Sequence, residues 1–87
     1  MRIDMLLNKL CLTKSRSIAK IACDKGLVSL NGKTAKASAE VKEGDIIQFH
    51  LYGYEHQIRV DKIPQGNVAK KDATNYYTLL SRKEISN

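Results

Sequence analysis

The chain has 87 residues and carries 15 lysines and arginines against 9 acidic residues, a formal net charge of +6. This length fits one domain and leaves little room for a deep substrate cavity, because so short a chain buries only about 60–65% of its unfolded surface. Hydrophobic residues make up 43% and charged residues 28% of the chain, as in folded globular proteins. With one Phe and no Trp, aromatic platforms for base stacking are scarce.

The positive charge is concentrated in one third of the sequence. Seven basic residues and one acidic residue lie between Lys9 and Lys36, whereas the eight basic and eight acidic residues outside this window cancel. A surplus confined in this way is typical of a surface that binds a polyanion such as a nucleic acid. The alternative is a solvated basic face without a partner.

Membrane-spanning, secreted and metal-binding classes are not favoured. No apolar run approaches the roughly 20 residues needed to cross a bilayer, and Asp4, Asn8 and Lys9 interrupt the apolar N-terminal segment where a signal peptide would be continuous. We therefore expect a cytoplasmic protein that does not bind a membrane. Cys11 and Cys23 lack the paired spacing of a metal site, so we expect free thiols that fill the core, no metal and no cofactor.

Two short amphipathic helices are predicted at the start of the chain. The first has an apolar stripe at helical spacing, formed by Ile3, Leu6, Leu7 and Leu10. We expect Asp4 to cap the start of this helix and Ser15 to cap a second helix over residues 16–25. Gly26 follows where a left-handed residue typically ends a helix. The second helix is expected to bury Ile18, Ile21 and Ala22.

A small, mostly antiparallel sheet is predicted next. Residues 27–30 and 33–37 are expected to pair as a hairpin, because Asn31-Gly32 between them is a strong two-residue turn signal. Further strands are expected at residues 46–51 and 57–63, joined through residues 52–55.

The last quarter of the chain is predicted to be a loop and a helix. Pro64 ends the preceding strand, and a third helix over residues 69–82 is expected to pack back on the sheet. Its helical spacing comes from Ala73, Tyr76, Tyr77 and Leu80. The predicted fold class is α+β: two N-terminal helices on a small antiparallel sheet, plus a C-terminal helix. Residues 1–63 form the main unit, and residues 64–87 pack on the same domain.

The start of the second helix is suited to binding phosphate. Free backbone N–H groups and the positive end of the helix dipole attract anions there, and Ser15 caps the same turn. Arg16 adds a guanidinium that can hold a phosphate by two parallel hydrogen bonds, and Lys14 adds a point charge. Lys20 lies one helical turn beyond Arg16 on the same face. The hairpin brings further cations, Lys33 and Lys36.

In this order and spacing, the residues resemble the S4 RNA-binding domain. The resemblance spans residues 1 to about 51 and rests on Arg2-Ile3-Asp4, Leu6-Leu7, Lys14-Ser15-Arg16-Ser17, Gly26, Leu30-Asn31-Gly32-Lys33, Lys36 and Gly44-Asp45. It implies the S4-like (αL) fold, in which two helices and the adjoining hairpin form the RNA-binding surface. The implied RNA-binding residues are Arg2, Lys14, Ser15, Arg16, Lys20, Asn31, Lys33 and Lys36. Asp4 and Gly44-Asp45 are implied to be structural.

The chain length favours a stand-alone member of this family. It is similar to small bacterial members, which include ribosome-quality-control factors and fifteen-kilodalton heat-shock S4 proteins. This resemblance implies an RNA-binding protein of the large (50S) ribosomal subunit. Such a protein binds rRNA and peptidyl-tRNA on stalled particles, supports C-terminal alanine tailing beside a tailing protein, and is a monomer away from the ribosome.

Two other classes stay open at this point. A small interaction protein, or an appendage in ribosome assembly or of an RNA enzyme, would bind RNA only secondarily, and its binding would depend little on salt. An enzyme is not expected. The candidate groups form no recognisable set of nucleophile, base and orienting residue; they are Asp45, His50, Glu55 and His56.

Overall fold

The computed structural model describes residues 1–85 of the chain. The elements in order are α1 (Ile3–Lys9), α2 (Arg16–Asp24), β1 (Val28–Leu30), β2 (Lys33–Thr34), β3 (Ile46–Leu51), β4 (Tyr54–Val60), the 3-10 helix η1 (Lys70–Asn75) and β5 (Tyr77–Glu84). Residues 86 and 87, the end of the predicted C-terminal segment, lie outside the described residues.

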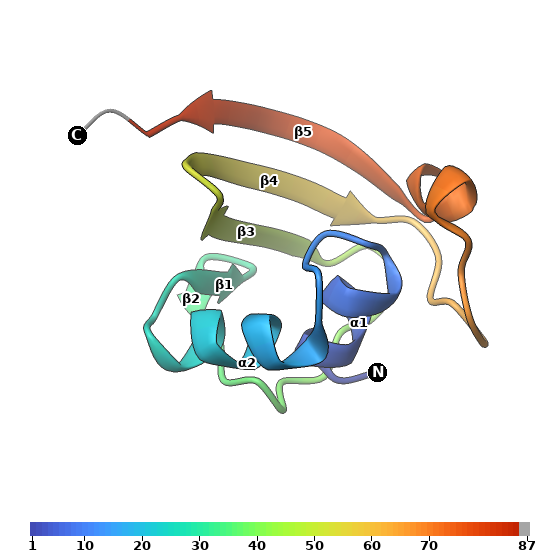
Figure 1. Cartoon of the computed structure of the whole chain (residues 1–87), viewed down its shortest axis with the longest axis horizontal. Coiled ribbons are helices and arrows are strands. Elements are labelled where there is room, and N and C mark those ends of the chain that lie inside the picture. Colours follow the sequence, from blue (N-terminus) through green and yellow to red (C-terminus); the bar gives the residue numbers. More distant parts are fainter. Residues whose placement is uncertain (86–87) are drawn as a thin grey trace.

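The strands form one antiparallel sheet in the order β2-β1-β3-β4-β5. Figure 1 shows α1 and α2 side by side near β1 and β3, while β5 is the outermost strand on the far side of β4. The core lies between the helices and the sheet, and its largest fully buried side chains include Ile3, Leu6, Leu7, Ile47, Phe49 and Ile58. The predicted α+β class is confirmed. None of the helices within residues 1–85 is long and apolar enough to cross a membrane.

The boundaries of α2 are those expected from its capping residues. The Ser15 side chain accepts a hydrogen bond from the backbone N–H of Ile18 at 3.2 Å, which satisfies one donor of the open first turn. Gly26 follows the helix with φ +75°, the left-handed conformation that ends helices most readily in glycine. The Ser15 cap and the Gly26 stop are therefore confirmed.

The prediction that Asp4 caps α1 is wrong. The N-cap residue is Arg2, whose backbone is extended, and Asp4 lies inside the first helical turn. The backbone N–H of Ile3 donates to the carbonyl of Ala39 at 2.8 Å, and that of Asp4 donates to the carbonyl of Ala37 at 3.3 Å. The segment from residue 37 to 39 thus satisfies the first donors of α1, so the Asp4 carboxylate is not needed as a cap.

The buried face of α2 also differs from the prediction. Its buried residues are Ala19, Ala22 and Cys23. Ile21 is 52% exposed, and Ile18 is half-buried. Small side chains allow a helix to approach its neighbours closely. The sequence contains apolar residues on both sides of this helix. The side that packs against α1 and β3 is the one with the smaller side chains.

Two hairpins share the same kind of turn. Asn31-Gly32 joins β1 to β2 with φ values of +51° and +86°, and Tyr52-Gly53 joins β3 to β4 with +54° and +81°. Because the second turn takes only two residues, β4 begins at Tyr54 and ends at Val60 rather than spanning residues 57–63. The predicted return strand 33–37 is shorter than expected, since only Lys33–Thr34 pairs with β1.

The predicted C-terminal helix over residues 69–82 is wrong for most of its length. Residues Lys70–Asn75 form a 3-10 helix, and Tyr77–Glu84 form β5, which pairs with the whole of β4. Ala73, Tyr76, Tyr77 and Leu80 satisfy a helical spacing, but Tyr and Thr also favour strands. The unpaired backbone groups along β4 give this segment a partner that local spacing does not reveal.

Asn31→Ala is expected to lower the free energy of unfolding by about 2 kcal/mol, because two contributions are lost. Asn tolerates the left-handed backbone of this turn. Its side chain also accepts from the N–H of Ile46 at 2.9 Å and donates to Asp45 at 3.2 Å. Urea denaturation followed by circular dichroism measures the change. Asn31→Gly, which keeps the turn conformation, should lose only about 1 kcal/mol; equal losses in both variants would contradict the backbone contribution.

Candidate nucleic-acid interface

A buried carboxylate holds two arginines at the meeting point of α1 and α2. Asp4 is 1% exposed. Its two oxygens accept hydrogen bonds from Arg2 Nε and Nη2, both at 3.2 Å, and from Arg16 Nε at 3.3 Å. The backbone N–H of Met5 donates to the same carboxylate at 2.8 Å. Arg2 immediately precedes α1 and Arg16 is the first residue of α2, so Asp4 joins the starts of both helices.

The ion pairs determine the charge state of Asp4. Burial by itself raises the pKa of this carboxyl group, because the charged form loses its hydration. The hydrogen bonds from Arg16 and Met5, together with the charges of Arg2 and Arg16, act in the other direction, and the pKa of Asp4 is lowered below its ordinary value of 3.8. The carboxylate is therefore ionised at neutral pH and holds both guanidiniums.

The two guanidiniums are fixed but accessible. The side chains of Arg2 and Arg16 are 43% and 50% exposed, whereas the Asp4 side chain between them is 1% exposed. An arginine presents five N–H donors in a planar fork, of which Asp4 takes only part. The exposed side of each fork is suited to binding a phosphate oxygen, and its orientation is set in advance.

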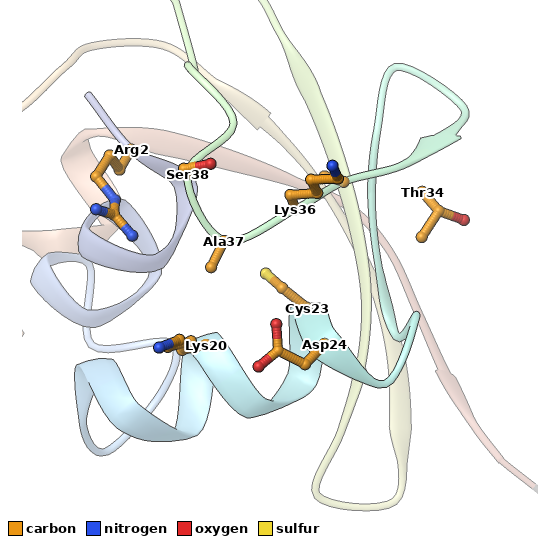
Figure 2. Close-up of a pocket in the computed structure, with 9 residues that line it drawn as sticks. Arg2, Lys20, Cys23, Asp24, Thr34, Lys36, Ala37 and Ser38 are labelled. Carbon is orange, nitrogen blue, oxygen red and sulfur yellow. The ribbon is translucent and has the colours of Figure 1, made fainter.

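A shallow groove extends from this pair of arginines along α2. Arg2 and Lys20 line it together with Asp24 on α2 and Thr34, Lys36 and Ser38 on the opposite segment. Figure 2 shows Arg2 and Lys20 toward one end of the groove and Lys36 and Thr34 toward the other. A second hollow adds Arg16 and Ser17 beside the same Arg2 and Lys20. We refer to the surface of Arg2, Arg16, Lys20 and Lys36 as the basic groove.

The opposite wall of the groove is held by the N-terminus. Arg2 forms an isolated β-bridge with Glu40, and the N–H of Val41 donates to the carbonyl of Met1 at 2.9 Å. On the sheet side, the N–H of Ala35 donates to the carbonyl of Val28 at 2.9 Å. The segment 35–41 is therefore fixed in position although it contains no strand of its own. Lys33 lies in a neighbouring hollow that shares Lys36 and Ser38 with this wall.

The two cysteines have different environments. Cys23 is buried beneath the groove, where burial, aided by the charges of Asp4 and Asp24, raises the pKa of its thiol to about 11. The thiol is therefore neutral and adds no charge to the groove. Cys11 is exposed rather than part of the core, so the expectation that both cysteines fill the core holds only for Cys23. No three His, Cys, Asp or Glu side chains within residues 1–85 are grouped to hold a metal ion.

Three of the predicted RNA-binding residues make their contacts outside the basic groove. Asn31 uses its side chain to hold the hairpin to the start of β3, through Asp45 and Ile46. The backbone N–H of Lys14 donates to the Tyr52 hydroxyl at 3.2 Å, and its ammonium lies 5.9 Å from the centre of the Tyr52 ring. Ser15 acts as the cap of α2. The structure brings together Arg2, Arg16, Lys20 and Lys36, with Lys33 beside them.

The structural role that the S4 resemblance implies for Asp4 agrees with its position, but its contacts with both arginines are not apparent from the sequence, where the Arg2-x-Asp4 spacing is the available signal. Ser17, which belongs to the S4 motif, and Ser38 line the hollows, although neither is among the predicted RNA-binding residues.

The chain matches known proteins over almost its whole length. The S4 domain family profile matches residues 1–47. A Helicobacter pylori protein named "RQC P-site tRNA stabilizing factor" is 42% identical over 85 residues, covering 97% of this chain and 100% of that protein. A Bacillus subtilis protein of the same name is 34% identical over 98% of both chains.

A solved structure has the same fold. The trimeric structure of Vibrio cholerae Heat Shock Protein 15 superimposes with a TM-score of 0.86 at 28% sequence identity, covering 93% of this chain and 82% of that one. The predicted resemblance to S4 proteins, including the fifteen-kilodalton heat-shock type, is confirmed by these comparisons.

Asp4→Asn is expected to lower the free energy of unfolding at pH 7 by about 1–3 kcal/mol, because charge-assisted hydrogen bonds to both arginines are lost. The pKa of Asp4 is lower in the folded chain than in the unfolded one, so its contribution is present above the unfolded value and is lost as the pH falls through the folded value. The stability difference between the two proteins should therefore shrink between about pH 5 and pH 2.

Urea denaturation at a series of pH values measures this difference. Asp61→Asn is the control. The pKa of Asp61 is also lowered, by the hydroxyl of Thr78 and then by Arg59, but this carboxylate lies on the exposed side of the sheet. That variant should lose less stability than Asp4→Asn at pH 7. An Asp4→Asn protein that follows the wild-type pH profile in parallel would contradict the assigned ion pairs.

Proposed function

The chain belongs to the S4 domain family and, within it, groups with the RQC P-site tRNA stabilizing factors, and we propose that it stabilises tRNA in the P site of the large ribosomal subunit during ribosome quality control. The single observation that carries the proposal is the basic groove, in which one buried carboxylate fixes two half-exposed guanidiniums beside Lys20 and Lys36. The proposed association with the ribosome implies a cytoplasmic location.

The proposed mechanism is a grip on phosphates. Arg2 and Arg16 act as oriented forks, which suits two-point hydrogen bonding to phosphate oxygens. Lys20 and Lys36 add charge along the groove and raise affinity without reading base identity. Folded RNA is recognised largely through shape and backbone contacts, so a fixed, concave, cationic surface can hold two RNA elements against each other. The protein stabilises a complex and carries out no chemical step.

We assign the partners and contact residues accordingly. The proposed partners are large-subunit rRNA and peptidyl-tRNA on the 50S particle, with a tailing protein of the quality-control system as a further one. The proposed contact residues are the predicted set, Arg2, Lys14, Ser15, Arg16, Lys20, Asn31, Lys33 and Lys36. Residues 1–63 form the proposed RNA-binding unit, and residues 64–85 pack on it. Off the ribosome the proposed state is a monomer.

Neither histidine belongs to the basic groove. His56 stacks on Phe49 with ring centres 4.8 Å apart. Burial and the neighbouring Arg82 charge lower the pKa of His56, so it is neutral at pH 7 and adds no cation. His50 Nε2 lies 3.7 Å from the Glu55 carboxylate on the paired strand. Each histidine thus contacts sheet neighbours rather than residues of the basic groove.

Arg16→Ala is expected to weaken binding to purified large subunits by about 10- to 100-fold, because charge-assisted hydrogen bonds to phosphate are lost. Co-sedimentation or filter binding at several salt concentrations measures the affinity. The slope of log K against log salt should become shallower by about 1. The affinity of Arg16→Lys should lie between those of wild type and Arg16→Ala, since lysine keeps the charge but not the planar fork of donors.

Arg59→Ala is the matched control for Arg16→Ala. The Arg59 side chain is 48% exposed and its Nε lies 2.9 Å from Asp61, so it resembles Arg16 in type, exposure and ion pairing but lies on β4. It should bind large subunits within about twofold of wild type. Equal losses for both variants would indicate a general effect of net charge and would contradict the groove as the binding site.

The chain is expected to slow the release of peptidyl-tRNA from isolated large subunits. Labelled peptidyl-tRNA bound to 50S particles is followed by filter binding, with and without a saturating amount of the protein. A protein that binds only the tRNA-bound state stabilises it in proportion to its own affinity, so Arg16→Ala at the same concentration should have little effect. Unchanged release with the protein bound would favour the alternative of an interaction protein.

A further inference from the structure

Tyr52 occupies an unusual position for an aromatic residue. It is the first residue of the two-residue turn between β3 and β4, with a left-handed backbone at φ +54°. Bulky side chains rarely adopt this conformation, whereas Asn and Gly do so readily. The other hairpin of this chain has Asn31 at the equivalent place with φ +51°. The two turns share their backbone, so the turn geometry does not explain why the second one carries Tyr.

The Tyr52 side chain is both exposed and held in place. It is 53% exposed, more than any other Phe or Tyr side chain within residues 1–85. Its hydroxyl accepts a hydrogen bond from the backbone N–H of Lys14 at 3.2 Å. The Lys14 ammonium lies 5.9 Å from the centre of the ring, within the range of a cation–π contact. The ring is therefore positioned before any ligand arrives.

The other tyrosines are used within the fold. Arg82 covers the ring of Tyr54, with its guanidinium carbon 4.2 Å from the ring centre. Tyr76 and Tyr77 pack against the hydrophobic core. Tyr52 thus differs from them in presenting a large part of its ring to solvent beside a lysine.

We propose that Tyr52 stacks on an unpaired nucleobase of the bound RNA while Lys14 contacts a neighbouring phosphate. Proteins that hold single-stranded nucleic acid combine an aromatic face for the base with a cation for the backbone. Lys14 belongs to the sequence window that carries the whole net charge of +6, which favours RNA over a protein surface as the partner. This proposal rests on the proposed function and adds a second contact, separate from the basic groove.

The contact predicts a pattern that electrostatics alone does not produce. Tyr52→Asn should weaken binding to protein-free large-subunit rRNA by about 10-fold, with an unchanged slope of log K against log salt, because stacking releases no counterions. Lys14→Ala should instead make the slope shallower by about 1. Because Asn suits this turn, Tyr52→Asn should be as resistant to urea as wild type or more so.

A single tryptophan reports stacking directly. The chain contains no Trp, so Tyr52→Trp introduces the sole indole in a mixture with protein-free rRNA. We expect this variant to keep wild-type affinity within about threefold and its fluorescence to be quenched when rRNA saturates it. Leu79→Asn is the control for the affinity loss of Tyr52→Asn, since Leu79 is also a large exposed side chain, at 52%, but lies on β5. It should bind rRNA as wild type does.

Three outcomes would overturn the proposal. They are wild-type rRNA affinity of Tyr52→Asn, unchanged fluorescence of Tyr52→Trp at saturation, and a loss seen with whole 50S particles but not with protein-free rRNA. The last outcome would assign Tyr52 to a ribosomal protein contact. Each leaves Arg16→Ala as a separate measurement of the basic groove, so failure of the Tyr52 contact and failure of the proposed function give different results.

Discussion

The buried carboxylate of Asp4 constrains the whole N-terminal half of the structure. A carboxylate that is 1% exposed is tolerated only when it is paired and hydrogen-bonded, since an unpaired buried charge costs several kcal/mol. Arg16 can reach it only if the start of α2 lies beside the start of α1. The connecting residues must therefore fold back, as they do when the N–H groups of Leu12 and Thr13 donate to the carbonyl of Leu7. The ion-pair cluster thus holds the starts of the two helices together.

The same cluster makes the surface selective in shape rather than merely positive. A lone surface arginine must give up rotamer freedom when it binds a phosphate. Arg2 and Arg16 have already lost much of that freedom to Asp4, whose negative charge also lowers the local positive potential. The arrangement therefore exchanges some long-range attraction for fixed donors. A tight grip on folded RNA depends more on donor geometry, while Lys20 and Lys36 supply attraction at longer range.

The elements that could be predicted are those whose signals are local. The apolar stripe of α1, the Ser15 cap, Gly26 and the Asn31-Gly32 turn depend on residues within a few positions of each other, and each was located correctly. β5 was missed because Tyr77 and its neighbours satisfy both helical and strand patterns, and the deciding partner, β4, lies 17 residues or more away in the chain. The same division between local and long-range signals applies to the site. Its cations were identified by motif, but the contacts of Lys14 and Asn31 with Tyr52 and Asp45 are long-range and leave no sequence pattern.

β5 lies at the edge of the sheet, away from the residues that shape the groove. β5 pairs only with β4, while the groove is built from α2, the N-terminus and the segment 35–41. β3 connects the two regions, because it pairs with β4 on one side and contacts α2 and β1 on the other. Changes along β5 can therefore reach the groove through β3, or through Tyr77, which packs against the same core as the helices. A small domain buries only a modest part of its surface. A fifth strand at the far edge adds buried surface to the sheet that α2 packs on, and it covers none of the cationic surface.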